Sequence, residues 1–222
     1  MTDKMIISVC DSTGKAVIEG YKDSLRDYAM RALEKEEAKA APDAEKLTLY
    51  VDMLNYGAAA QVKFDYNTSD LANKDLTAAQ QAYATSKAPT VANAQVKGTG
   101  YAGSTLTLES EIQLNFVYNN DVMDKVSYAV ATWVDHYGNT QSSTISVSDF
   151  KAFSSTMTYV GVKGLVVADY NQQVTLTLYT ADGAVVSTSK DSIGHYVSRA
   201  TNAGNLDKMI LYFGASAYAS FH

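Results

Sequence analysis

The sequence predicts an α+β protein: an antiparallel, Ig-like β-sandwich with attached helical hairpins, in which one half-module is duplicated at the two chain ends. Apolar residues recur with a period of about 3.6 residues before Pro89 and about two after it. The second part also breaks into short alternating segments separated by Gly, Asn and Asp, which is typical of a sandwich. Because proline disfavours helix continuation, we place the boundary in the segment 86–90. The predicted domains are residues 1–88, a hairpin plus a helical pair, and residues 89–222, a sandwich that ends in a helical pair.

The duplication is visible at corresponding positions of the two chain ends. Each copy contains an apolar hairpin, a Lys-Asp-Ser sequence and a closing apolar segment with Gly-Ala. These segments lie at 5–18, 22–24 and 53–60 in the first copy and at 174–187, 190–192 and 210–217 in the second. Such repetition indicates a modular protein built by duplication. We therefore expect Leu54 and Leu211 to be equivalent core positions, and Tyr28 and Tyr196 likewise.

The first elements are a hairpin and helices. Residues 4–10 and 15–19 flank an Asp-Ser-Thr-Gly turn, which predicts a β-hairpin. Because an isolated two-stranded hairpin is marginal in water, we expect it to pair with a sheet or to pack on the helices. Serine, aspartate and threonine cap the free N–H groups of a first helical turn. The expected N-caps are Ser24 for the first helix and a residue near Thr77 for the third, and Pro42 with Asp43 is expected to end the first helix and to begin the second.

The second part is expected to consist of strands until the last two helices. The strands follow from alternating apolar residues between turn formers and lie at 106–108, 112–118, 126–134, 144–148, 156–162, 164–168, 173–180 and 184–188. A capped helix is expected at 192–199 and a last helix from Asn205, each with one apolar stripe.

Composition argues against several classes of protein. The formal net charge is -6 and no cluster of Lys and Arg is present, so a nucleic-acid partner is not expected. No stretch approaches the ~20 apolar residues that span a bilayer, so no membrane insertion is expected within this chain. Cys10 is the only cysteine, which favours a bacterial or cytosolic origin over a secreted eukaryotic one. One cysteine and three scattered histidines do not predict a zinc site, and no metal and no cofactor are expected.

The segment 133–140, Trp-Val-Asp-His-Tyr-Gly-Asn-Thr, is the strongest candidate for a binding site. It is predicted to form a hairpin tip, where tyrosine and tryptophan present large, rigid contact areas with polar ends. The predicted binding residues are Trp133, His136, Tyr137 and Asn139. We expect no catalytic role for the Asp135–His136 pair, because no nucleophile is positioned beside it and adjacent strand residues point to opposite faces. No catalytic residue is predicted.

A cluster of oxygen ligands at Asn119, Asn120, Asp121 and Asp124 could hold calcium or form a turn. It lacks the spacing and the glycine of a twelve-residue calcium loop. Because Asn and Asp are common turn formers, a turn is predicted.

Three stretches resemble parts of large surface proteins of gut-dwelling clostridial bacteria. The stretches are Leu54–Gln61 with Phe64–Asn67 and Leu71–Asn73, then Gly103–Ile112, and finally Thr177–Gly183 with Ser192 and Tyr196. Together they span most of the chain, in the same order as in those modules. The resemblance implies a secreted, cell-wall-associated sandwich and helical pair, with no catalytic residues to carry over. It also implies that residues 1–64 are the closing part of a unit whose opening strands are missing here.

The expected function is that of an extracellular, non-enzymatic binding or adhesion module. The resemblance implies a host protein, immunoglobulin included, or a host glycan as the partner, with signal and anchor outside this fragment. The alternatives are a structural spacer and a carbohydrate-binding module. A tyrosine-rich, weakly charged surface suits contact with a protein or a sugar. The identity of the partner and the oligomeric state are left open by the sequence.

Overall fold

The structure is a computed structural model that describes residues 1–85, 91, 94–108, 111–199 and 205–221. Backbone contacts divide the chain into two compact units: unit 1 (Met1–Lys87 with Gly204–Ser216) and unit 2 (Ala88–Ala203 with Ala217–His222). The described residues form helices and three antiparallel sheets, which confirms the α+β class. The linker predicted at 86–90 lies outside the described residues.

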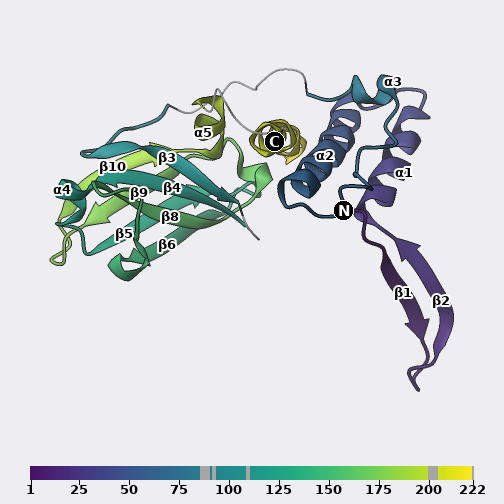
Figure 1. The fold of residues 1–222 in the computed structure, drawn as a ribbon, viewed down its shortest axis with the longest axis horizontal. Helices are drawn as coiled ribbons and strands as arrows, with labels where there is room; N and C mark the ends of the chain where they lie inside the picture. The colour runs from purple at the N-terminus through teal and green to yellow at the C-terminus, as the bar shows by residue number, and fades with distance from the viewer. Residues whose placement is uncertain (86–90, 92–93, 109–110, 200–204, 222) are drawn as a thin grey trace. The chain divides into compact units, whose positions relative to one another are not determined.

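Unit 1 begins with an antiparallel hairpin of β1 (Met5–Cys10) and β2 (Ala16–Asp23), drawn in purple in Figure 1. Asp11 holds the turn, since its Oδ1 accepts hydrogen bonds from the backbone N of Thr13 at 2.8 Å and of Lys15 at 3.1 Å. The two strands form a sheet of their own, and all six residues of β1 are exposed. The prediction that this hairpin pairs with a sheet or packs on the helices is therefore wrong for this chain.

The helices of unit 1 are α1 (Leu25–Glu37), α2 (Ala44–Lys63), α3 (Ala78–Gln81) and the first part of α6 (Asn205–Phe221). The side chains of Ser24, Asp43 and Thr77 accept hydrogen bonds from backbone N–H groups two or three residues further on. These bonds satisfy donors that have no partner within the first turn of a helix. The N-caps predicted at Ser24 and near Thr77 are confirmed, and Asp43, where a helix was predicted to begin, is the N-cap of α2.

The core of unit 1 lies mainly between α1 and α2. One cluster of buried residues comprises Ala29, Leu54, Ala58 and Ala72, and a second comprises Leu33, Leu47 and Val51. Gly57 allows close approach, because a Cβ there would lie 3.1 Å from the Cβ of Ala72 and against the side chain of Met1. The ring of Tyr56 packs on that of Phe213 of α6 at 5.1 Å.

The expected equivalence of core positions holds only in part. Leu54 is fully buried, as predicted, whereas the side chain of Leu211 lies outside the described residues. Tyr28 is 55% exposed, so its assignment to the core is wrong. Tyr196 is only half-buried.

Unit 2 contains two four-stranded antiparallel sheets, of strand order β10-β9-β5-β6 and β3-β4-β8-β7 (Figure 1). The strands of the first sheet are β5 (Tyr128–Val134), β6 (Thr140–Ser146), β9 (Val174–Tyr179) and β10 (Val185–Asp191). Those of the second are β3 (Tyr101–Leu108), β4 (Ile112–Asn119), β7 (Lys151–Ala152) and β8 (Met157–Leu165). The remaining helices are α4 (Asn120–Met123) and α5 (Ile193–Arg199).

In β5, β9 and β10 alternate residues are buried, so each of these strands has one inward face. Val174, Leu176 and Leu178 of β9 are buried while the residues between them are half-buried. Two expectations for this part of the chain need correction. β8 covers most of the strand predicted at 156–162 and only the first two residues of the one predicted at 164–168, which continues into the 3₁₀ turn Val167–Asp169. The turn predicted at the Asn-Asp cluster is the one-turn helix α4.

Candidate functional site

The loop 135–139 connects β5 to β6 and is held together by one carboxylate. Oδ1 of Asp135 accepts hydrogen bonds from the backbone N of Tyr137 at 3.0 Å and of Asn139 at 2.9 Å. Oδ2 accepts one from Nε2 of Gln141 at 2.7 Å. Burial acts to raise the pKa of Asp135, but the hydrogen bonds from Asn139, Gln141 and Tyr137 outweigh it and lower the pKa. The loop is thus closed around an ionised side chain.

A second carboxylate fixes the histidine of this loop. Asp169 ends the 3₁₀ turn Val167–Asp169 and is only 2% exposed. Its Oδ1 lies 2.8 Å from both the backbone N and the Nδ1 of His136, and its Oδ2 accepts a hydrogen bond from the backbone N of Val166 at 3.0 Å. His136 is therefore anchored to a segment 33 positions away in the sequence. Sequence reasoning paired His136 with Asp135 and missed Asp169.

The four predicted binding residues fall into two groups. His136, Tyr137 and Asn139 lie on the loop, and Tyr137 is 70% exposed with its ring 4.0 Å from that of His136. Trp133 lies on β5 and is only 8% exposed. Its expected place in an exposed aromatic tip is therefore wrong, because its side chain points into the core of unit 2. We call residues 135–139 the β5–β6 tip.

Replacing Asp169 by Ala should loosen the β5–β6 tip. The change leaves the backbone N of His136 and of Val166 without their acceptor; both bonds are only partly buried, so the cost lies at or below about 1 kcal/mol per group, the low end for an unsatisfied group. We expect a lower melting temperature and faster amide exchange at 135–139. Asp149→Ala is the matched control, since Asp149 ends the other 3₁₀ turn and is exposed. Equal behaviour of the two variants would contradict the anchoring role.

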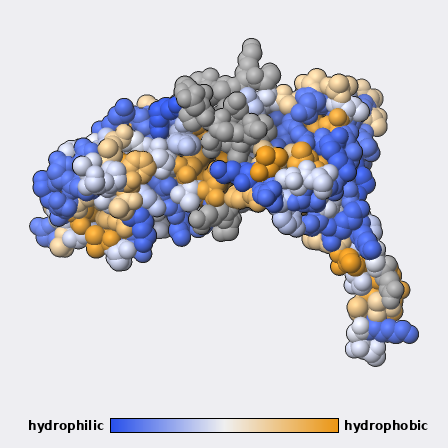
Figure 2. All heavy atoms as spheres, viewed as in Figure 1, coloured by the Kyte–Doolittle hydropathy of each residue, from blue (hydrophilic) through white to orange (hydrophobic). Residues whose placement is uncertain are grey.

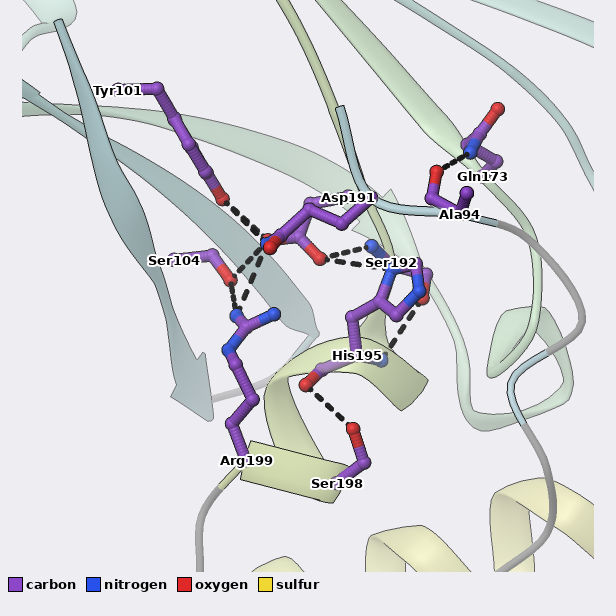
Figure 3. Close-up of polar contacts among 10 residues, drawn as sticks. Ala94, Tyr101, Ser104, Gln173, Asp191, Ser192, His195, Ser198 and Arg199 are labelled. Atoms are coloured by element: carbon purple, nitrogen blue, oxygen red, sulfur yellow. Dashed lines mark hydrogen bonds and ion pairs between the residues drawn. The ribbon is translucent and has the colours of Figure 1, made fainter. Parts of the chain in front are cut away.

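Unit 2 contains a second polar cluster around Asp191, the last residue of β10 and fully buried (Figure 3). Its Oδ2 accepts hydrogen bonds from the hydroxyls of Tyr101 and Ser104, the latter at 2.7 Å. Nε2 of Gln95 and the guanidinium of Arg199 donate to the same oxygen at 2.7 Å and 3.3 Å. The backbone N of Ser192 donates to Oδ1 at 2.8 Å, so that five donors among the described residues converge on this carboxylate.

The electrostatics of this cluster favour a charged Asp191 and a neutral Tyr101. Burial acts to raise the pKa of Asp191, but the hydrogen bonds from Tyr101 and Ser104 and the charge of Arg199 outweigh it, so the pKa is lowered. Burial and the neighbouring Asp191 carboxylate raise the pKa of the Tyr101 hydroxyl strongly. The carboxylate therefore links β3, β10 and α5 by charge-assisted hydrogen bonds.

The hydroxyl groups of the two serines near His195 form hydrogen bonds with the backbone of α5. Oγ of Ser192 accepts a bond from the backbone N of His195 at 3.1 Å and caps α5, as predicted. Oγ of Ser198 donates to the carbonyl of His195 at 3.0 Å. Nδ1 of His195 lies 3.3 Å from Oδ1 of Asp191. This arrangement holds α5 against β10.

A polar groove of about 420 Å³ opens on unit 2, away from both clusters. Its lining combines hydroxyl, amide and charged side chains with one tyrosine: Gln113, Ser143, Thr144, Asp149, Lys151, Tyr159 and Lys163. None of these residues was singled out by the sequence.

In the described part of the chain, no helix is both long and apolar enough to cross a membrane. The same residues contain no group of three or more His, Cys, Asp or Glu side chains arranged to hold a metal ion. Comparisons of the chain with protein-family models, with curated proteins and with solved structures found no match.

Proposed function

We propose that this chain is an extracellular, non-enzymatic binding module of a bacterial surface protein and that it binds a host protein through the β5–β6 tip. The observation that carries the proposal is the exposure of Tyr137 on a fixed loop. Tyrosine offers a large contact area at low entropic cost, and a loop that is ordered before binding loses little freedom in the complex. Asp135 and Asp169 supply that order.

The proposed fold of unit 2 is an Ig-like sandwich. Taken as strands A to G, the sheet β3-β4-β8-β7 has the order A-B-E-D and the sheet β10-β9-β5-β6 has the order G-F-C-C′. The buried Trp133 on β5 occupies the strand that carries a core tryptophan in immunoglobulin domains. In this frame the β5–β6 tip is the loop between strands C and C′, and Asp169 lies in the turn between strands E and F.

The proposed partner is a host protein, with immunoglobulin as the first to test, and the proposed location is the bacterial cell wall. Loops at the end of a sandwich are tolerant of variation and commonly carry recognition. A carbohydrate-binding module is the second candidate, and the polar groove lined by Tyr159, Lys151 and Lys163 favours it. A spacer would bind through neither surface.

Replacing Tyr137 by Ala should weaken binding at least about tenfold, because truncating a central aromatic contact costs about 2 kcal/mol or more. The test is capture of serum and mucus proteins on the immobilised full chain, beside a glycan array. Phe153→Ala is the matched control, because Phe153 is also an exposed aromatic residue (49%) but lies away from the tip. It lies near the start of β8, whereas Asp169, which anchors the tip, follows the end of that strand. Glycan binding that is lost in the Tyr159→Ala variant would support the polar groove as a carbohydrate-binding site instead. Binding to neither panel would favour the spacer.

A further inference from the structure

The hairpin β1–β2 exposes apolar side chains along both strands, and Figure 2 shows orange and pale-orange residues on part of this hairpin. The apolar residues that are more than half exposed are Met5, Ile6, Ile7, Val9, Val17, Ile18 and Tyr21. Two strands without a covered face are marginal in water, and exposed apolar strands serve as templates for pairing. The hairpin therefore has the properties of an element whose partner lies outside this chain's two units.

The hairpin β9–β10 pairs its first residues in the same register as β1–β2, but it is covered by other strands of unit 2. It therefore indicates which contacts a partner would provide to β1–β2. Met5 pairs with Asp23 as Val174 pairs with Asp191. The next two pairs also correspond: Ile6–Lys22 with Thr175–Lys190, and Ile7–Tyr21 with Leu176–Ser189. In unit 2 the face that contains Val174, Leu176 and Leu178 is buried, whereas the corresponding Met5, Ile7 and Val9 are 57%, 53% and 51% exposed.

The correspondence extends to the chain on both sides of the hairpins. Each terminal aspartate accepts a hydrogen bond from the backbone N of the serine that follows it and binds an arginine eight positions further on. These pairs are Asp23–Arg31 and Asp191–Arg199. On the other side, the backbone N of Arg26 donates to the carbonyl of Met1 at 3.2 Å as that of Gly194 donates to Tyr170 at 2.9 Å.

One difference marks where the missing partner would lie. Asp191 receives hydroxyls from Tyr101 and Ser104 of β3, a strand of the opposite sheet. Asp23 receives a tyrosine hydroxyl only from Tyr21 of its own hairpin, at 3.3 Å, within the described residues. Within the described residues, no strand that corresponds to β3 donates a hydrogen bond to Asp23.

We propose that β1–β2 is a docking element that completes an open β-sandwich: a partner segment that has strands arranged like β3–β8 and lacks the last two. β1 pairs antiparallel with the partner's counterpart of β5, as Leu176 pairs with Ala131 in unit 2. Met5, Ile7 and Val9 enter the partner's core, and its counterpart of β3 donates hydroxyls to Asp23. This inference rests on the proposed sandwich fold and not on the proposed ligand of the β5–β6 tip.

The test is a fusion in which residues 94–169 are placed directly before Met1 of the full chain. This junction is chosen because Met1 occupies the position of Tyr170. Hydrogen exchange is then compared between the fusion and the chain alone. We expect the amides of 5–23 to exchange about 100-fold more slowly in the fusion, as in a strand that joins a cooperative sheet. Exchange of these amides at the same rate in both proteins would overturn the proposal.

Two substitutions in the fusion separate docking from a nonspecific apolar contact. Ile7→Lys lies on the face that corresponds to Leu176 and should abolish the protection, whereas Ile6→Lys corresponds to the outward Thr175 and should leave it in place. Equal loss in both variants would contradict the proposed register. Loss of ligand binding by Tyr137→Ala is measured on the chain alone, so the two proposals fail independently.

Discussion

Replacing Asp191 by Ala is expected to lower the free energy of unfolding of unit 2 by about 3 kcal/mol. The carboxylate is fully buried, and its removal leaves the hydroxyl of Tyr101 and the amide of Gln95 without their acceptor. It also leaves the guanidinium of Arg199 without its counter-charge. The measurement is denaturant unfolding followed by the fluorescence of Trp133, the single tryptophan, which reports on unit 2 alone.

Asp23→Ala is the control for this experiment. Asp23 has the corresponding serine and arginine partners but belongs to unit 1, and its partner Arg31 is half-exposed, so that solvent weakens the pair. The fluorescence transition should therefore stay at the denaturant concentration of the unsubstituted chain. A loss of stability in Asp191→Ala no larger than in Asp23→Ala would contradict the assignment of Asp191 as the link between β3, β10 and α5.

The Asp191 carboxylate also makes the free energy of unfolding of unit 2 depend on pH. The pKa of Asp191 is lower in the folded chain than the ordinary value of about 3.9. The contribution of the ionised carboxylate to the stability of unit 2 is therefore fully present above that value. It is lost as the pH falls through the lowered pKa of the folded state. The difference in stability between the unsubstituted chain and Asp191→Asn should thus be constant above about pH 5 and shrink below about pH 4.

Leu54→Ala is expected to destabilise unit 1 by about 2–5 kcal/mol, the range for a fully buried leucine. The cavity would open between α1, α2 and Ala72, which pack around this side chain. Leu25→Ala is the matched control, because Leu25 lies on α1 and is 56% exposed. Amide exchange of α1 and α2 measures the change in unit 1 directly. A cost below about 1 kcal/mol would place Leu54 in a loosely packed region.

Local signals made much of the secondary structure predictable. Ser24 and Thr77 were assigned as caps, and Asp43 as the start of a helix, because each bond that they make spans only two or three residues. The turn at Asp11 is local in the same way. Strand ends were less predictable: a break was expected between residues 162 and 164, whereas β8 continues through Gly164, which has a φ of +82°, to Leu165.

The candidate site was less predictable because its decisive contacts join distant positions. No sequence pattern around Asp169 predicts a contact with His136, which lies 33 positions away, and only the fold brings the two side chains together. Tyr101 and Ser104 meet Asp191 across 90 and 87 positions of sequence. Trp133 was assigned to an exposed tip although the strand predicted at 126–134 includes it, because the sequence does not indicate which face of β5 is buried.

The central claim, recognition through the β5–β6 tip, is tested most directly by the dissociation constant of a purified serum partner. The measurement compares the unsubstituted chain with Tyr137→Ala and Phe153→Ala by surface binding kinetics. We predict a dissociation constant at least about tenfold higher for Tyr137→Ala, mainly through faster dissociation, and no more than about twofold higher for Phe153→Ala. Equal dissociation constants for all three proteins would contradict the claim.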